Sequence, residues 1–383
     1  MDPKIDLQVI HQGYDRETCW VHARPGVIPG DPPIGIVTSH ALRLTGMDVY
    51  YEINDTRSND GGDTWQGFIP HKEAFARQPI PDGREEGVSD FSLQWHAASG
   101  KLLGTGHTVV YENDTLGATN TRPRSTAYSC YDPDTLQWST WQKLKMPEGF
   151  FNAGAGSTQR HDLDNGEILL PIYYLMEGSG SDSPCFGQYC STVLRCSFDG
   201  QVLAHIEHGN ELTHPDVRSG FCEPSIASAG GRYFLTLRQY ESGYVTVSDD
   251  GLHYPDPIPW CFDDGSELGS YDTQQHWLVH RDDLYLVYTR RGAGNDNVYN
   301  HRAPLFMARV DTDALCVIRE TEIILVPNRG ARLGNFGVAK FHEDEIWVVV
   351  SEWMQTIAPD HHNFLTCEKY GSDNSVFLAR VRF

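Results

Sequence analysis

The amino-acid sequence predicts an all-β fold, a β-propeller of six blades with Asp-rich hairpin turns. Three observations support this prediction: short runs of β-branched and aromatic residues fill the chain, long helical periodicity is missing, and one turn motif recurs. Four-stranded units of about 40 residues or more that repeat around a ring form propellers. Six units of about 64 residues account for the 383 residues.

The recurring turn is clearest in "SNDGGDTW" at residues 58–65. Asp60 is expected to hold backbone N–H groups there, the glycines permit positive φ, and Trp65 closes the turn. "SDDGLHY" at 248–254 repeats the pattern, and weaker copies stand at 130–138, 196–203 and 309–317. Strand-like runs flank the first copy, so the motif is interpreted as a structural β-hairpin.

Strand-like segments lie between these turns. Examples are "KLLGTGHTVVY", "GEILLPIYYL", "GRYFLTLRQY", "DDLYLVYTR" and "DEIWVVVSEW". The last run, "SVFLARVRF", and the first, "IDLQVIHQGY", are predicted to share one blade, which would close the ring and remove exposed sheet edges. No Pro/Gly/Ser-rich linker divides the chain, so residues 1–383 are assigned to one domain.

The composition limits the kinds of molecule that the chain is expected to bind. The formal net charge is −22, from 52 acidic and 30 basic residues, which disfavours nucleic acid and anionic membranes because both attract basic surfaces. No run of about 18 apolar residues is present, and the first residues lack the basic and apolar regions of a signal peptide. The chain is expected in the cytoplasm, or outside the cell after removal of a signal; its oligomeric state stays open.

The nine cysteines contain no CxxC pair, so no zinc site is predicted, and no other metal or cofactor is expected. Cys185 and Cys190, in "CFGQYC", are a candidate disulfide pair. The other cysteines are interpreted as buried small hydrophobic residues.

The repeated turns resemble the Asp boxes, also called BNR repeats, of the sialidase (neuraminidase) superfamily, whose members are six-bladed propellers. The copy at 58–65 matches the Ser-x-Asp-x-Gly-x-Thr-Trp pattern in full, and the copy at 248–254 matches it well. Asp boxes in that family lie away from the active site. The resemblance therefore implies a fold, and more weakly an enzyme that acts on acidic glycans or oligosaccharides.

Several stretches resemble the segments that carry the active site in sialidases. "EPSIASAGGRYFLTLRQY" at 223–240 implies Glu223 as the catalytic glutamate and Arg238 as an arginine that binds a carboxylate. "HARPGVIP" at 22–29 and "HRAPLFMARV" at 301–310 imply Arg24 and Arg302 as two further arginines. Asp48, in "SHALRLTGMDVYY", stands where an acid/base aspartate is expected. Arginines bind a carboxylate through bidentate, charge-assisted hydrogen bonds without a metal.

The resemblance departs from sialidases at the nucleophile. These enzymes carry a catalytic tyrosine in the last blade, and the comparable stretch here is "RLGNFGVAKFHEDEIWVVVSEW". Phe336 stands near the place of that tyrosine, and a phenyl ring cannot attack an anomeric carbon. The tyrosine-based mechanism is therefore in doubt.

Other polar residues near strand ends are further candidates. His107, in "GTGHTVVY", and two residues of "GSYDTQQHW", Tyr271 and His276, are candidate catalytic residues, because such side chains can give or take a proton. Arg160, His40 and Gln275 are candidate substrate-binding residues.

Three functions remain open at this point. The first is an exo-acting glycoside hydrolase on a terminal carboxylated sugar, with Glu223 and Asp48 as carboxylates. The second is a lyase that acts on uronic-acid glycans, with His and Tyr as base and acid and an arginine that neutralises the carboxylate. The third is a propeller that binds glycans without catalysis.

Overall fold

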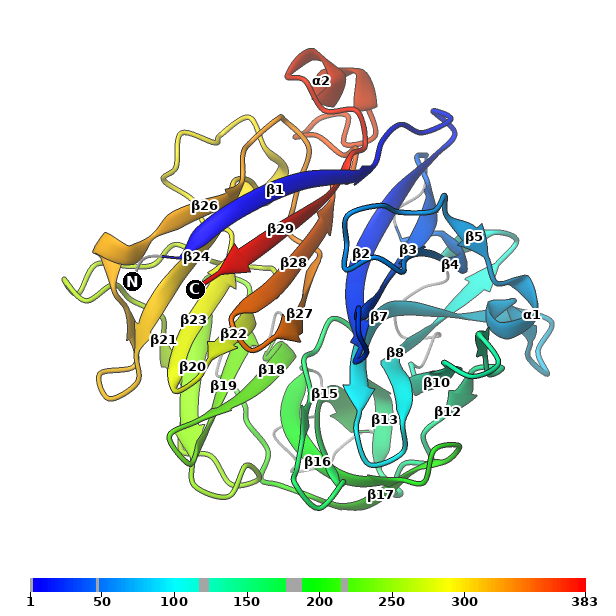
Figure 1. The fold of residues 1–383 in the computed structure, drawn as a ribbon, viewed down its shortest axis with the longest axis horizontal. Helices are drawn as coiled ribbons and strands as arrows, with labels where there is room; N and C mark the ends of the chain where they lie inside the picture. The colour runs from blue at the N-terminus through cyan, green and yellow to red at the C-terminus, as the bar shows by residue number, and fades with distance from the viewer. Residues whose placement is uncertain (1–2, 46–47, 117–123, 177–187, 215–219) are drawn as a thin grey trace.

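The computed structural model describes residues 3–45, 48–116, 124–176, 188–214 and 220–383. These residues form an all-β fold whose sheets follow one another around a common centre, the arrangement of a β-propeller (Figure 1). The prediction of an all-β propeller is confirmed. Within the described ranges the strands form six sheets, and the helices are short.

Each of the first three sheets along the chain is built from strands that are consecutive in the sequence. One contains β2 (Thr18–Ile28), β3 (Ile34–Arg43), β4 (Tyr50–Ser58) and β5 (Ile69–Pro70). The next contains β6 (Gln78–Pro79), β7 (Glu85–His96), β8 (Lys101–Glu112), β9 (Thr115–Leu116), β10 (Thr126–Asp132), β11 (Gln137–Trp138) and β12 (Gln142–Lys143). The third contains β13 (Phe150–Gly154), β14 (His161–Asp162), β15 (Ile168–Met176), β16 (Cys190–Phe198) and β17 (Leu203–His208).

The other three sheets complete the arrangement. One contains β18 (Cys222–Ala229), β19 (Arg232–Arg238), β20 (Gly243–Ser248) and β21 (Ile258–Pro259). The next contains β22 (His276–His280), β23 (Asp283–Tyr288), β24 (Leu305–Asp311), β25 (Cys316–Val317) and β26 (Ile323–Val326). The last contains β27 (Phe336–His342), β28 (Glu345–Ser351), β29 (Val376–Arg382) and β1 (Lys4–His11).

Helices occur only as short connections in the described residues. They are α1 (Lys72–Phe75), α2 (Phe364–Lys369) and two 3-10 helices, Tyr299–His301 and Arg319–Thr321. None of the helices in these ranges is both long and apolar enough to cross a membrane.

The two ends of the chain meet in one sheet, as the sequence predicts. β1 pairs antiparallel with β29, from Lys4 opposite Arg382 to His11 opposite Val376, and β29 pairs on its other side with β28. Figure 1 shows the blue first strand beside the red last strand. The N-terminal strand therefore covers the edge that β29 would otherwise expose.

The two best copies of the turn motif have the same hydrogen bonds. In the first, the Gly62 N–H donates to Ser58 Oγ at 2.8 Å, and the Thr64 N–H donates to Asp60 Oδ1 at 3.0 Å. In the second, the Gly251 N–H donates to Ser248 Oγ at 3.0 Å. The His253 N–H donates to Asp250 Oδ1 at 2.8 Å. Each carboxylate thus holds turn N–H groups that lack a partner in the sheet.

The first strand of most sheets borders the centre of the propeller. β2 lies beside β7 and β27, and β18 lies beside β22. Large aromatic residues such as Trp260, Trp277 and Trp347 are fully buried in the apolar layers between sheets. Such packing holds the inner strands rigidly, so side chains near their ends have defined positions.

Eight cysteines lie in the described residues, and two of them, Cys222 and Cys261, are only partly buried, contrary to the expectation that the cysteines other than Cys185 and Cys190 are buried. Cys190 is disulfide-bonded, and seven of the described cysteines are free. Cys185, the candidate partner, lies outside the described residues.

Candidate active site

A polar cavity of about 360 Å³ is bounded by residues of several sheets. Its lining includes four arginines and four carboxylates: Arg124, Arg238, Arg302, Arg332, Asp48, Asp90, Glu223 and Asp272. The local charge is therefore balanced, whereas the chain as a whole carries a net charge of −22. An anionic ligand is compatible with such a cavity because the nearest charges dominate the field at contact distance.

Backbone bulges aim several polar side chains at this cavity. The register of the first strand shifts between Val21 and Arg24 in β2, and the same shift occurs in β7, β13 and β18. Each bulge contains a polar residue in the left-handed region: His22 (φ 56°), Asp90 (φ 52°), Asn152 (φ 47°) and Glu223 (φ 45°). A bulge interrupts the alternation of a strand and re-aims a side chain, at some cost in backbone strain.

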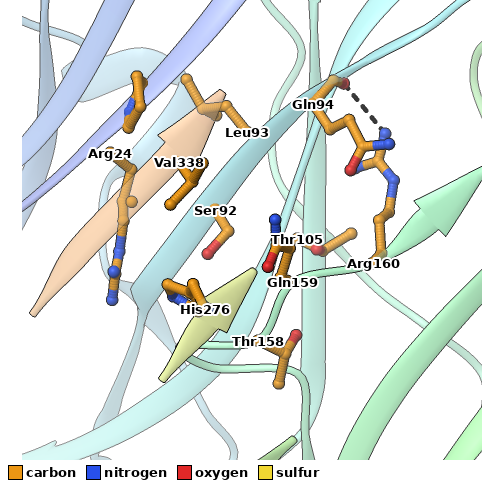
Figure 2. A pocket seen from close by; sticks show the side chains of 12 residues that line it. Arg24, Ser92, Leu93, Gln94, Thr105, Thr158, Gln159, Arg160, His276 and Val338 are labelled. Carbon is orange, nitrogen blue, oxygen red and sulfur yellow. Dashed lines mark hydrogen bonds between the residues drawn. The ribbon is translucent and has the colours of Figure 1, made fainter. Parts of the chain in front are cut away.

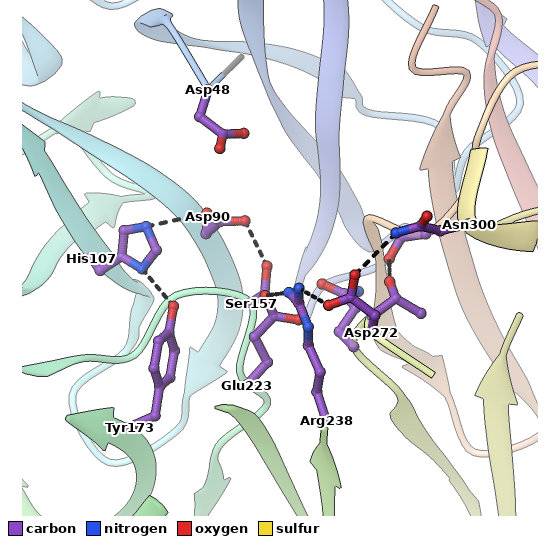
Figure 3. Close-up of polar contacts among 12 residues, drawn as sticks. Asp48, Asp90, His107, Ser157, Tyr173, Glu223, Arg238, Asp272 and Asn300 are labelled. Atoms are coloured by element: carbon purple, nitrogen blue, oxygen red, sulfur yellow. Dashed lines mark hydrogen bonds and ion pairs between the residues drawn. The ribbon is translucent and has the colours of Figure 1, made fainter. Parts of the chain in front are cut away.

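A line of hydrogen bonds crosses one wall of the cavity (Figure 3). His107 Nε2 lies 3.2 Å from Asp90 Oδ2, and the Tyr173 hydroxyl lies 3.1 Å from His107 Nδ1. Arg124 Nη1 donates to the same hydroxyl at 2.9 Å. Because a carboxylate only accepts, Nε2 carries the imidazole proton, so Nδ1 accepts from Tyr173.

The protonation states of these groups suit proton transfer. Burial lowers the pKa of His107, as does the charge of Arg124, while Asp90 acts in the opposite direction. Burial raises the pKa of Tyr173 well above its usual value, although Arg124 opposes this. At neutral pH the imidazole is therefore a free base and the phenol keeps its proton.

Asp90 fixes the His107 end of this line of hydrogen bonds. Burial raises its pKa, but the neighbouring His22, His107 and Arg24 outweigh burial and hold the pKa well below the usual value. The Ser157 hydroxyl donates to Asp90 Oδ1 at 2.6 Å, and His22 Nδ1 lies 3.3 Å from the same oxygen. The carboxylate is thus ionised and held from several sides.

On the opposite wall, Arg238 joins two carboxylates (Figure 3). It donates to Glu223 Oε1 and to Asp272 Oδ1, each at 2.5 Å, and Asn300 Nδ2 donates to Asp272 Oδ2 at 3.0 Å. Burial raises the pKa of Glu223, and Arg238 acts against this shift. The charge of Arg238 is therefore largely compensated within the protein.

Arg302 and Arg332 keep unused donors. Arg302 donates to the backbone oxygen of Asp272, and the guanidinium of Arg332 lies 3.3 Å from the centre of the Trp353 ring. Among the described residues, Nε of each arginine is buried and has no hydrogen-bond partner. Burial, followed by the charge of Arg302, lowers the pKa of Arg332 to about 9. This end of the cavity can accept an anionic group because a buried Nε donor without a hydrogen-bond partner is costly.

The structure brings five of the sequence-predicted residues together in this cavity: Glu223, Asp48, His107, Arg238 and Arg302. Asp48 accepts a hydrogen bond of 2.7 Å from the Tyr50 hydroxyl. Their catalytic and binding roles stay predictions, but their proximity is a geometric fact of the fold.

Arg24 does not line this cavity, contrary to its predicted place beside Arg238 and Arg302. Its side chain is 1% exposed and donates to Ser157 Oγ at 2.9 Å and Gln274 Oε1 at 2.7 Å. The bulge after Val21 explains the difference, because it turns His22 toward the cavity and leaves Arg24 inside the centre of the propeller.

Arg160, His276 and Gln275 also lie outside the cavity, where they connect strands. Arg160 donates to Asp162 Oδ1 at 2.8 Å and to two backbone oxygens. His276 Nδ1 lies 2.8 Å from Ser225 Oγ, and Gln275 accepts from a threonine hydroxyl and donates to a serine hydroxyl. These hydrogen bonds satisfy buried polar groups, which is a structural role.

His40 and Tyr271 lie outside the cavity lining as well. His40 is buried beside His22 and Tyr50, and burial lowers its pKa to about 4. The Tyr271 hydroxyl lies 2.6 Å from His301 Nδ1.

Phe336 begins β27 and is fully buried, in contact with the ring of His276. The neighbouring residue, Asn335, lines the cavity instead. Glu223, which the resemblance implies as the catalytic glutamate, accepts a hydrogen bond from Arg238.

Sequence reasoning missed Asp90, Arg124, Tyr173, Asp272 and Arg332. Asp272 is next to Tyr271 in the sequence, and Arg332 stands shortly before Phe336. Closeness to these two candidate residues was therefore the signal that could have identified both. Asp90 stands in a bulge, and nothing in "VSDFSLQW" marks the bulge before the sheet is assembled.

No group of three or more His, Cys, Asp or Glu side chains suited to a metal ion occurs in the part of the chain that the structure describes.

Comparison with known proteins relates the chain to solved structures alone. No protein-family model matches it, and no curated protein matches it in sequence. A Dyadobacter fermentans protein of unknown function aligns with TM-score 0.63 and 12% identity over 99% of both chains. Trypanosoma rangeli sialidase in complex with the inhibitor DANA aligns with TM-score 0.59 and 12% identity over all of this chain. The leech intramolecular trans-sialidase aligns with TM-score 0.57 and 12% identity over 97% of this chain.

These similarities show a sialidase-like propeller fold. The chain spans 60% of the length of the Trypanosoma rangeli sialidase and 70% of the leech enzyme. Activity does not follow from fold, because one scaffold supports many functions.

Proposed function

We propose that the chain is a six-bladed, Asp-box propeller enzyme that cleaves an acidic glycan next to a carboxylated sugar by β-elimination. The observation that carries this proposal is the Asp90–His107–Tyr173 line with Arg124, in one cavity with Arg302 and Arg332. A uronic-acid residue provides both the carboxylate and the acidic proton beside it that this arrangement suits.

Arg302 and Arg332 would bind the substrate carboxylate. Their buried Nε donors have no partner within the described residues, and each good hydrogen bond to a charged group contributes about 1.5–3 kcal/mol. A neutralised carboxylate also stabilises the negative charge that develops when the neighbouring carbon loses its proton.

Tyr173 and His107 would move the proton. The phenol takes the proton from the carbon while its own proton passes to Nδ1 of His107. The bond from the adjacent carbon to the leaving glycosidic oxygen breaks, and a carbon–carbon double bond forms. Tyr173 then protonates the leaving oxygen and recovers its proton from His107, so the reaction needs no water and no cofactor. Arg124, which donates to the phenol oxygen, stabilises the phenolate that forms.

A hydrolase is the second candidate, supported by Glu223. Burial raises its pKa, as in a general acid of glycosidases, and Asp48 lines the same cavity as a possible base for water. With a carboxylate that activates water for direct attack, this reaction would invert the sugar configuration.

Product analysis separates the two reactions. Acidic oligosaccharides that contain uronic or sialic acids are incubated with the protein, and the products are followed by near-ultraviolet absorbance and mass. An unsaturated, absorbing sugar supports the lyase, and a product that gains water supports the hydrolase. Tyr173→Phe should abolish elimination, whereas Tyr128→Phe, a buried tyrosine outside the cavity, should keep it. Binding without any product would leave only a glycan-binding propeller.

A further inference from the structure

A second, much smaller cavity lies in the centre of the propeller (Figure 2). Its volume is about 20 Å³, and its walls come from β2, β7, β8, β22 and β27 together with residues 158–160. Arg24 connects it to the candidate active site, because Arg24 donates to Ser157 and Ser157 donates to Asp90. The proposed function does not use this cavity.

Buried hydrogen-bond donors at this cavity lack partners. Arg24 uses only Nη2 for its hydrogen bonds to Ser157 and Gln274. Within the described ranges, Arg24 Nε, Arg24 Nη1 and Ser92 Oγ are buried and have no hydrogen-bond partner. Buried polar groups are satisfied in the great majority of folded proteins, so donors of this kind indicate an ordered water or a bound ion.

The charge around the cavity favours a negative ligand. Two arginines, Arg24 and Arg160, line it, and no carboxylate does. Arg160 is neutralised by Asp162 at 2.8 Å, whereas the closest ion pair of Arg24 is to Asp90 Oδ1 at 3.9 Å, beyond hydrogen-bond distance. Burial lowers the pKa of Arg24 to about 10, with Asp90 acting in the opposite direction, so the guanidinium stays charged and incompletely paired at neutral pH.

We propose that this cavity binds one small monovalent anion of halide size, held by Nε and Nη1 of Arg24 and by the hydroxyl of Ser92. A volume of about 20 Å³ has room for about one water-sized particle, so a monatomic anion fits it better than a carboxylate, sulfate or phosphate. Water fits the volume too, but it provides no charge to compensate the arginine. The anion is a structural ligand that stabilises the meeting point of the inner strands.

Thermal unfolding of the full chain in solution tests the proposal. The unfolding temperature is measured in sodium chloride or bromide and in sodium gluconate at the same concentrations, so that ionic screening is equal. A ligand that binds only the folded state raises stability in a saturable way. We expect halide, and not gluconate, to raise the unfolding temperature along a saturation curve. Equal curves in the three salts would overturn the proposal.

Variants locate the effect. Ser92→Ala removes one donor and should raise the halide concentration at half-saturation at least about fivefold, the loss expected for one hydrogen bond. Ser351→Ala is the matched control, because Ser351 is also buried without a partner for its hydroxyl but lies on β28, outside this cavity. An unchanged halide response in Ser92→Ala would place the anion elsewhere and overturn the site.

Crystals grown in sodium bromide give a direct result, since bromide scatters anomalously. The proposal predicts an anomalous peak within hydrogen-bond distance of Arg24 Nε or Nη1, and its loss or weakening in Ser92→Ala. Density at that place without an anomalous signal would identify water and refute the anion site.

Discussion

Single residues at the strand bulges decide what the cavity can do. His22, Asp90, Asn152 and Glu223 occupy equivalent left-handed positions in four inner strands, and three of them line the cavity. Asp90 is the most connected of the four, because it contacts His107, His22 and Ser157. It touches no proposed reacting atom, so it is a positioning residue for His107.

Asp90→Asn should lower kcat at least about tenfold and change KM little, because the amide can no longer hold the Nε2–H tautomer of His107 as an ionised acceptor does. The pH profile adds a second readout. Asp90 raises the pKa of His107, so its loss should move the acid limb of kcat to lower pH. If the acid limb of kcat lies at the same pH in Asp90→Asn and in the original protein, measured with an acidic oligosaccharide, Asp90 does not position His107.

Arg332 provides a test of carboxylate recognition. Arg332→Gln should reduce kcat/KM for a carboxylated substrate by about 10- to 100-fold, the value of one charge-assisted hydrogen bond, and reduce it much less for a neutral analogue. Arg291→Gln is the control, since Arg291 is paired with Glu267 outside the cavity. Equal losses on both substrates would mean that Arg332 only supports the fold.

At the scale of elements, the turn motif stabilises hairpins through a serine as well as an aspartate. Ser58 is 1% exposed and its hydroxyl both accepts from the Gly62 N–H and donates to Asp60. Trp65 donates to the Gly62 oxygen at 3.1 Å and packs beside Trp347, but it remains half-buried. Hydrogen bonds within the turn therefore contribute more to the motif than the apolar packing of Trp65 does.

Ser58→Ala and Ser248→Ala should each lower the free energy of unfolding by about 1–3 kcal/mol, because each leaves a buried glycine N–H without its acceptor. Chemical denaturation measures the change. Thr140→Ala, at an exposed position outside these turns, should stay within about 0.5 kcal/mol. Loss of activity without loss of stability in either serine variant would contradict a structural role for these turns.

At the scale of the whole molecule, closure of the ring connects the ends of the chain. β1 supplies one strand to the sheet of β27, β28 and β29, so residues far apart in sequence form one unit. The candidate site depends on this closure, since Asn335 and Arg332 adjoin β27 while Asp48, Asp90 and His107 come from the first sheets along the chain. The site and the closed ring should therefore be lost together.

The full chain should unfold in one cooperative transition by circular dichroism and by tryptophan fluorescence, as a single domain does. A chain that lacks residues 1–12 exposes the edge of β29 and should unfold at a lower temperature and aggregate more readily. Two separate transitions in the full chain would contradict the assignment of residues 1–383 to one domain.

Features that depend on neighbouring residues were determined by the sequence itself. The Asp60 and Asp250 turns form because a carboxylate binds N–H groups three or four residues away. The runs rich in Val, Ile, Tyr and Trp have the composition of strands that are half-buried in a sheet. The fold class followed from these local patterns, whereas Glu223 and Arg238 were implied by the resemblance of residues 223–240 to a sialidase segment.

The tertiary structure decided what those local patterns could not. His22 lines the cavity and Arg24 does not, because β2 has a bulge that forms only when β2 pairs with β3. The same kind of bulge in β7 brings Asp90 within reach of His107. Tyr173 meets His107 across two sheets, 66 positions apart. Such contacts depend on strand register and on the packing of sheets around a centre, and both arise from interactions across the whole chain rather than from any short stretch of sequence.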